Sequence, residues 1–584
     1  MPALVTRKFR VHNAKQFKES IDESAAWGGS GVTGSEDVTT LDEHYYTFVG
    51  RTTVWDDDNA PPEPIDTTKQ NTYDPWDTMI AAKKITSADV SHVIPRYNWT
   101  SGTVYTQYND NDHELYTNTA SPMIVMTQDF NVYKCMDNAN NALSTSQPIS
   151  VSSEAGAIDD KYGQDNYKWK YLYTITAAEA LKFVTPNYIP VKTIRNANSI
   201  GMTGTTGMPT DDGSAQFDIE KNAVDGSIDV YEIINAGGNY QFFNGTCLDG
   251  SNDSSTTQIV TTTTGINETN DVYNNSGVYV NNVIRKVIDY SYDVGSGKGT
   301  FTLDSALSTA ATGAFSIFPQ VRIYGDGNGA SARCVEGATG GTIGAVFSGD
   351  VGSNYSQAEV KVIQSQSSGA GAVIKPIISP KGGHGYNLVE ECGGNFLMIN
   401  TRLEQSEGGK FTTSNDFRQI GVVKSPISAN GTHRFVATAG TQALTIRIGT
   451  INGSNFIADN VIVGASSGAQ AKIVDVTDVT VGGIAFKDLR CINVDLGPSD
   501  TNKILGNAET NGVDMTNPAG GTVSGLPGGF QQENVSCSGS TAVITSITAG
   551  EMKPYSGSLL YVENRSPIAR AADQTEDIKL IIEF

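Results

Sequence analysis

The sequence predicts a mainly β, multi-domain protein of β-sandwich architecture, with a few short helices and glycine-rich β insertions. Glycine supplies 61 of the 584 residues, and Ser, Thr and Asn are also plentiful. Apolar residues make up 38%, which is low for a compact enzyme but usual for a β protein rich in turns. Few long segments have helical periodicity, which favours short strands and many turns. A chain of this length has room for two to four domains.

The first hundred residues are expected to mix strands with short helices. Ala3–Phe9 is predicted as a strand, and a helix is predicted to begin at Ala14. Tyr45–Val54 is rich in aromatic and β-branched residues, which favours a strand. Asp74 is expected to cap a further helix, with Pro75 at its first position.

Residues 196–385 contain an internal repeat, with copies at 215–240 and 330–355. Each copy is expected to run as strand, glycine turn, strand, glycine loop and aromatic residue. The small-residue start of a copy recurs at 369–372 and again at 468–471. These copies predict small β modules, and their irregular period argues against a long solenoid.

The last residues of the chain alternate in polarity. Ile578, Leu580, Ile582 and Phe584 fall on one face, which is the pattern of a half-buried strand. An apolar strand at the end of the chain is expected to pair inside a sheet.

The segment before this strand is predicted as a short strand, Leu559–Val562, which ends in a turn around Pro567. Arg565 and Arg570 follow among several carboxylates. Bidentate pairing between these arginines and the carboxylates would tie the hairpin to the final strand. The carboxylates are Glu563, Asp573 and Glu576.

A long ordered motif runs through this end of the chain. It comprises Tyr561, Glu563, Asn564, Arg565, Pro567, Ile568, Asp573, Gln574, Thr575, Glu576, Ile578 and Phe584. The run resembles the C-terminus of the baseplate wedge proteins known as gene product eight in T-even-type, contractile-tailed bacteriophages. Earlier positions resemble the same family in the same order, among them Arg51, Trp55, Trp76, Pro95, Arg96, Trp99 and Arg418.

The resemblance covers roughly 1–195, 395–428 and 555–584 and departs from the family at two large insertions. It implies a non-enzymatic structural subunit of the virion's tail baseplate, assembled in the host cytoplasm. It also implies a homodimer that contacts other wedge subunits and takes part in the shape change at tail contraction. The motif positions above are then structural or interface residues. The expected domains are 1–95 (main β body), 96–195 (second β domain), 196–385 (inserted β modules), 386–430 (return to the main body), 431–549 (inserted small β domain) and 550–584 (closing strands).

Charge and composition argue against several classes of partner. The net charge of −23 and the absence of a long basic run disfavour nucleic acid and anionic membranes. No apolar run approaches the ~20 residues of a membrane helix, so direct membrane insertion is not expected. The six scattered cysteines form no C-x-x-C pair, so neither a zinc site nor a disulfide framework is expected.

Motifs that would carry chemistry are weak. No two of the six histidines stand at helical ligand spacing, and His384 in G-G-H-G is interpreted as a loop residue. Oxygen-rich stretches at 56–58, 110–114 and 325–329 are interpreted as solvated turns. No phosphate-loop, nucleophile-elbow or zinc-protease motif occurs. No catalytic residue, cofactor or metal ligand is therefore assigned.

One alternative function stays open at this stage. The glycine-rich β insertions would also suit a receptor-binding spike or fibre protein, possibly one that cleaves polysaccharide. A pair of catalytic carboxylates depends on a spatial separation that sequence cannot reveal.

Overall fold

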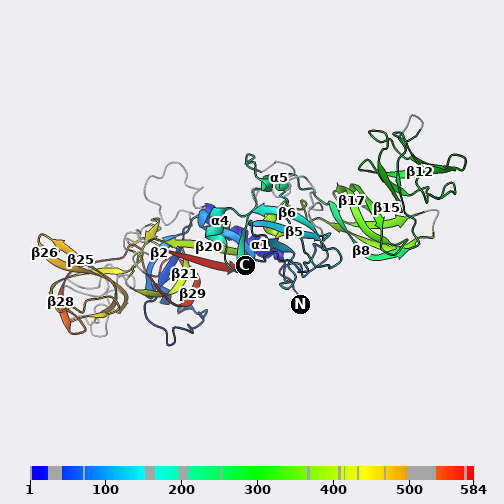
Figure 1. Ribbon diagram of the computed structural model, residues 1–584. Coiled ribbons are helices and arrows are strands. Elements are labelled where there is room, and N and C mark those ends of the chain that lie inside the picture. Colours follow the sequence, from blue (N-terminus) through cyan, green and yellow to red (C-terminus); the bar gives the residue numbers. More distant parts are fainter. Residues whose placement is uncertain are drawn as a thin grey trace. The chain divides into compact units, whose positions relative to one another are not determined.

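The computed structural model describes residues 3–584, except 24–42, 70–72, 152–164, 196–207, 250–252, 365–367, 405–409, 414, 430–432, 466–468, 496–533 and 571–574. The fold is mostly β, with 47% of residues in strands and 9% in helices, as predicted (Figure 1). The chain divides into two compact units. Unit 1 comprises Met1–His92 and Asn395–Phe584, and unit 2 comprises Val93–Gly394. Within the described residues, no helix combines the length and the apolarity needed to cross a membrane.

Unit 1 contains a five-stranded antiparallel sheet in the order β22-β2-β1-β21-β29. A second layer pairs β20 with β30. Apolar side chains from both layers meet in one core, so this body is built like a sandwich. The elements are α1 (Arg7–Glu23), β1 (Tyr45–Gly50), α3 (Asp74–Thr78), β2 (Met79–Lys84), η1 (Ser87–Asp89), β20 (Phe396–Leu403), β21 (Asp416–Lys424), β22 (Ala439–Gly440), β29 (Ser558–Ala569) and β30 (Glu576–Glu583); β3 (Val90–Pro95) runs across the division into unit 2.

A closed six-stranded barrel lies between β22 and β29 in the sequence. Ile446, Ile473 and Leu489 are among the side chains that fill its interior. The barrel also contributes Val474 and Ile492 to the sandwich core. Its strands are β23 (Leu444–Asn452), β24 (Val461–Gly464), β25 (Gln470–Val481), β26 (Ile484–Asp495), β27 (Asn534–Cys537) and β28 (Ser540–Thr548).

Unit 2 consists of several β modules. One module is a three-stranded sheet, β4-β5-β6. Helices α4 and α5 follow it in the sequence. Another module is a six-stranded sheet with the order β10-β13-β12-β11-β14-β9. The pairs β8–β19, β15–β18 and β16–β17 surround a further core. The elements are β4 (Ile124–Met126), β5 (Asn131–Asp137), β6 (Lys168–Thr174), α4 (Ala177–Phe183), β7 (Tyr188–Val191), α5 (Ala215–Lys221), β8 (Ile228–Gly238), β9 (Phe243–Thr246), β10 (Gln258–Thr261), β11 (Gly277–Val280), β12 (Val283–Asp293), β13 (Lys298–Leu303), β14 (Ala314–Phe318), β15 (Gln320–Gly325), β16 (Asn328–Glu336), β17 (Ile343–Ser353), β18 (Ala358–Ile363), β19 (Ala370–Ile378) and α6 (Leu388–Glu391).

The internal repeat is present, but its halves combine differently from the prediction. β8 and β17 are the corresponding strands of the two copies. Each contains a glycine with a positive φ, Gly237 at 63° and Gly352 at 65°. Each of these glycines contacts the small residues of its partner strand, β19 for β8 and β16 for β17. Residues 215–217, predicted to begin the first copy as a strand, instead form helix α5. The segment 369–372 takes that place in the first copy.

The N-terminal prediction was wrong. Ala3–Phe9 is not a strand, because α1 begins at Arg7. Thr6 caps the helix, and its hydroxyl accepts a hydrogen bond from the Phe9 amide at 3.3 Å. The helix is fixed by burial of Val11, Ala14 and Ile21, which lie beyond the segment that was predicted as a strand.

The turn predicted at Pro567 was also wrong, because β29 continues through it. Gln419 pairs with Asn564 and Phe417 pairs with Ile568, so three residues of β29 bulge opposite Arg418. A bulge on an edge strand is a position where proline removes no ladder hydrogen bond.

The final strand is confirmed. β30 pairs along its length with β20, and Ile578 and Leu580 are buried in the sandwich core. Ile582 and Phe584 are only partly buried, and the Phe584 ring packs 5.6 Å from the ring of Phe17.

We expect Leu580→Ala to lower the free energy of unfolding by about 2–5 kcal/mol, because it opens a cavity in a packed core. Asp577→Ala, on the exposed face of the same strand, should cost less than about 0.5 kcal/mol. Chemical denaturation of both variants beside the parent measures the difference. Equal shifts would mean that β30 does not contribute to the core.

Candidate functional site

Arg418, on β21, fastens the loop that follows β1. Arg418 is 5% exposed, and its guanidinium forms a fork with the Asp58 carboxylate, Nε to Oδ1 at 2.9 Å and Nη2 to Oδ2 at 2.8 Å. Nη1 donates to the Thr52 carbonyl at 3.1 Å. The hydrogen bond from Arg418 lowers the pKa of Asp58. Because a fork fixes both distance and direction, it holds the loop in one orientation on the sheet.

Trp55 extends the same cluster to the edge strand. Its indole Nε1 donates to the Arg565 carbonyl, in the bulge of β29, at 2.9 Å. The Arg51 guanidinium lies 3.5 Å from the centre of the Trp55 ring, a cation–π arrangement. Arg51 has a φ of 55°, a backbone conformation that non-glycine residues rarely adopt. The Arg565 side chain pairs with Glu563 at 3.1 Å.

Asn564 closes the cluster. Its side chain accepts a hydrogen bond from Gln419 at 2.9 Å and donates to the Pro62 carbonyl at 2.9 Å. The loop therefore covers backbone and side-chain groups at the edge of the sheet, which protects an edge strand from pairing with other chains. We call the set Arg51, Trp55, Asp58, Arg418, Asn564 and Arg565 the loop clamp.

The structure places the other predicted site residues as follows. Arg570 and Glu576 form one expected pair, with Nε and Oε2 2.6 Å apart, and Arg570 also donates to the Phe411 carbonyl at 2.7 Å. The Tyr561 hydroxyl donates to Glu563 at 2.9 Å, so neither residue spans from the strand to β30. Asp573 and Gln574 lie outside the described residues.

Four further positions do not join the clamp. Trp76 is buried in a core cluster of unit 1. In unit 2, Arg96 donates to the Thr185 carbonyl at 3.0 Å, and the Trp99 indole donates to Ser144 at 3.2 Å. Pro95 ends β3.

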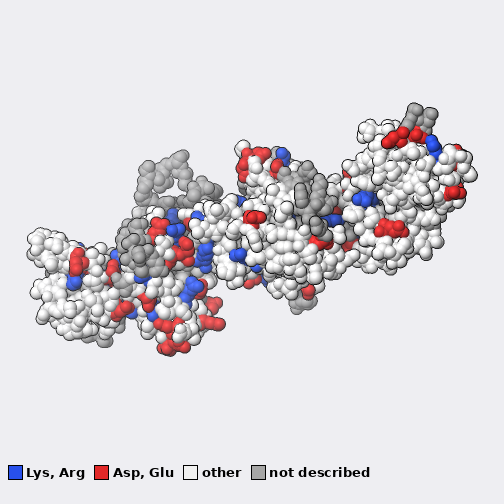
Figure 2. Space-filling model, viewed as in Figure 1, with Lys and Arg blue, Asp and Glu red and all other residues white. Residues whose placement is uncertain are grey.

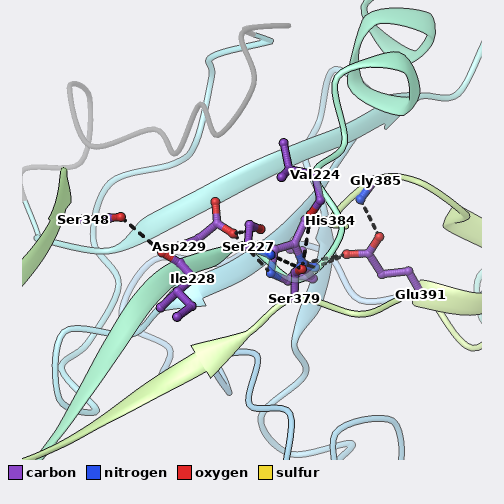
Figure 3. A network of polar contacts seen from close by, with 10 residues as sticks. Val224, Ser227, Ile228, Asp229, Ser348, Ser379, His384, Gly385 and Glu391 are labelled. Carbon is purple, nitrogen blue, oxygen red and sulfur yellow. Dashed lines mark hydrogen bonds and ion pairs between the residues drawn. The ribbon is translucent and has the colours of Figure 1, made fainter. Parts of the chain in front are cut away.

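A second cluster, which the sequence reasoning missed, lies in unit 2. Lys134 on β5 is fully buried and hydrogen-bonds to both Glu391 and Nδ1 of His384. The Gly385 amide donates to the second oxygen of Glu391 at 2.6 Å (Figure 3). Asp229 accepts from the Ser227 hydroxyl at 2.6 Å, and its Oδ2 lies 3.9 Å from Nε2 of His384. The G-G-H-G motif marked His384 as a loop residue but gave no sign of these partners.

Burial and neighbouring charge set the protonation states of this buried ion network. Burial lowers the pKa of His384, and the Lys134 ammonium lowers it further. The pKa of Glu391 is also lowered, because the attraction of Lys134 and the hydrogen bonds outweigh burial. Since Nδ1 of His384 accepts from Lys134, we place the histidine proton on Nε2, toward Asp229. Lys170, nearby, has a pKa lowered by burial.

The network is closed to solvent. His384 is 4% exposed and Glu391 is 5% exposed. Because Lys134, Asp229 and Glu391 come from β5, β8 and α6, the network ties the three-stranded sheet to the modules that follow it in sequence. Among the described residues, no group of three His, Cys, Asp or Glu side chains is placed to hold a metal ion.

Comparisons of the chain with protein-family models and with curated proteins found no match.

We expect Arg418→Lys to release the loop, because a lysine cannot form the two-point fork to Asp58. Limited proteolysis should then cut within residues 54–66 faster than in the parent. Lys553→Arg, at an exposed site of the same unit, is the control. Equal cleavage rates in the parent and Arg418→Lys would show that the fork does not restrain the loop.

We expect Glu391→Gln to cost about 3–5 kcal/mol of unfolding free energy, because it leaves the Lys134 ammonium buried without its carboxylate. Glu114→Gln, at an exposed site, should change stability by less than about 0.5 kcal/mol. Denaturant titration at pH 7 compares the two.

Ionisation of Glu391 and His384 should also make the stability of the protein depend on pH. The folded-state pKa values of His384 and Glu391 are both lowered, so the unfolded chain binds more protons as the pH falls below ~6.5 and then ~4.3. Stability should therefore be fully present above about pH 6.5 and decline with acidification. In Glu391→Gln, the decline below about pH 4.3 should be smaller. A parallel loss in both proteins would exclude this carboxylate as its source.

Proposed function

We propose that the chain is a non-enzymatic structural subunit of a contractile-tail baseplate wedge. It would act as a homodimer in contact with other wedge subunits, and it would be assembled into the virion in the host cytoplasm. The support comes from one observation. Residues that carry the resemblance, drawn from three segments far apart in the sequence, meet in the loop clamp.

The convergence matters because the resemblance rests on the order of residues along the sequence, which carries no information about contacts. Trp55 and Arg565 stand 510 positions apart, yet they share a hydrogen bond. Arg418 reaches the same loop through its fork with Asp58, 360 positions away, although Asp58 does not itself carry the resemblance. A chance likeness at scattered positions would have no reason to select partners in one hydrogen-bonded cluster.

The clamp also suits a structural task. A baseplate subunit must present surfaces that assemble in order and move as rigid bodies when the tail contracts. A loop fixed by the fork to Arg418, the indole hydrogen bond of Trp55 and the amide contact of Asn564 keeps its outer side chains in place without a partner. Binding then costs less ordering entropy.

Labelling of purified phage tails with an antibody against this chain tests the proposal by electron microscopy. Label on the baseplate body is the expected result, and label on distal fibres would instead support the receptor-binding alternative. That alternative also predicts release of reducing sugar from host-surface polysaccharide above a heat-killed control. The proposed structural role predicts none.

A further inference from the structure

Two surfaces of unit 1 have opposite character. The stretch 3–18 contains five Lys or Arg residues and no Asp or Glu, in a chain whose net charge is −23. The loop 54–66 contains five Asp or Glu residues and no Lys or Arg. We call these the basic face and the acidic loop. Their charged residues are Arg7, Lys8, Arg10, Lys15 and Lys18 on the first, and Asp56, Asp57, Asp58, Glu63 and Asp66 on the second. Arg10 already lies 3.5 Å from Glu583, and Asp58 is paired with Arg418.

Each surface also exposes large apolar side chains. On the basic face, Leu4, Val5 and Phe9 are 84%, 57% and 55% exposed. On the acidic loop, Val54 and Ile65 are 61% and 59% exposed. Single exposed apolar residues need no explanation. Apolar residues grouped with charges of one sign, on two surfaces of opposite sign, give the composition of two halves of an interface.

Both surfaces are held in place from within. Helix α1 buries Val11, Ala14 and Ile21 in unit 1, so its outer side, with Lys8 and Phe9, stays fixed outward. The loop clamp holds the acidic loop. Figure 2 shows acidic side chains gathered on unit 1. Neither surface needs to fold on binding, which lowers the cost of association.

We propose that the basic face of one copy binds the acidic loop of a second copy. The inference rests on the homodimer of the proposed function and assigns its interface. In a two-fold dimer each copy supplies both surfaces, so the contact between a basic face and an acidic loop occurs twice. Two copies that each carry −23 repel one another overall, and local complementarity of this kind would offset that repulsion.

Other occupants of the basic face fit less well. A basic amphipathic helix binds a membrane through its apolar side, but the apolar side of α1 is already buried in the core. A nucleic acid would meet the repulsion of the whole acidic chain.

Charge reversal tests the interface with two residues outside the clamp. Lys8 and Glu63 are both exposed, and neither forms a hydrogen bond or ion pair with the described residues. Lys8→Glu and Glu63→Lys, each alone, place like charges together at both contacts of the dimer. We expect the dissociation constant from sedimentation equilibrium to rise at least tenfold in each. Lys381→Glu, an exposed site in unit 2, carries the same charge change and should leave it unchanged.

A mixture of the two variants is the decisive measurement. In a heterodimer of Lys8→Glu with Glu63→Lys, one contact has both charges reversed and the other is the parent contact. With a different fluorophore on each chain, we expect the mixture to dimerise with nearly the parent's affinity, while each variant alone stays monomeric. Phe9→Ser should weaken the dimer without changing charge, and added salt should weaken the parent dimer.

The inference is overturned if Lys8→Glu and Glu63→Lys dimerise like the control, or if the mixture fails to recover. A parent chain that is monomeric at every concentration also overturns it. The baseplate role is judged separately by the antibody labelling, so a dimer built through another surface would leave that proposal standing. Circular dichroism of each variant confirms that the fold is retained.

Discussion

The pairing of β1 with β21 is the interaction on which unit 1 depends. It joins the two halves of the chain that flank unit 2, in register from Tyr45 opposite Lys424 to Gly50 opposite Gln419. Beneath it, Thr47 and Thr401, separated by 354 positions, share a buried hydrogen bond at 2.6 Å. The entropy of closing so large a loop grows only slowly with its length. An insertion the size of unit 2 is therefore compatible with a stable sandwich, although non-local pairing makes folding slow.

The same strand also explains the clamp. β21 places Phe417 and Gln419 in the ladder with β29, while the bulge of β29 leaves Arg418 opposite no single partner. Its guanidinium is free to reach back to Asp58 and Thr52 instead. The ladder thus determines where the loop is fastened, and the loop in turn covers the edge strand. Only Asp58 of the acidic loop takes part in the fork, so Arg418 does not neutralise the other carboxylates of that loop.

Local pattern predicted some parts of the fold and failed at others for identifiable reasons. Alternation at Ile578 and Leu580 predicted β30 correctly because one face of that strand meets the core. The residues around Pro567 favour a turn, but in the structure they form a bulge on an edge strand. The residues of Ala3–Phe9 are mostly exposed, and the burial that fixes α1 begins only at Val11.

Neither cluster of polar residues could be found from spacing. Arg51, Trp55 and Arg418 were chosen by resemblance, and only the strand register brings them together. Lys134 and Glu391 stand 257 positions apart, and the network they form with His384 depends on three elements packing at once. A buried ion pair contributes little net stability compared with apolar residues of the same volume, but it penalises any arrangement that leaves one charge unpaired. Such a network therefore specifies how the modules of unit 2 fit together more than it strengthens them. The clamp does the same for one loop of unit 1. In the proposed structural role, both would keep defined surfaces in place before a partner binds.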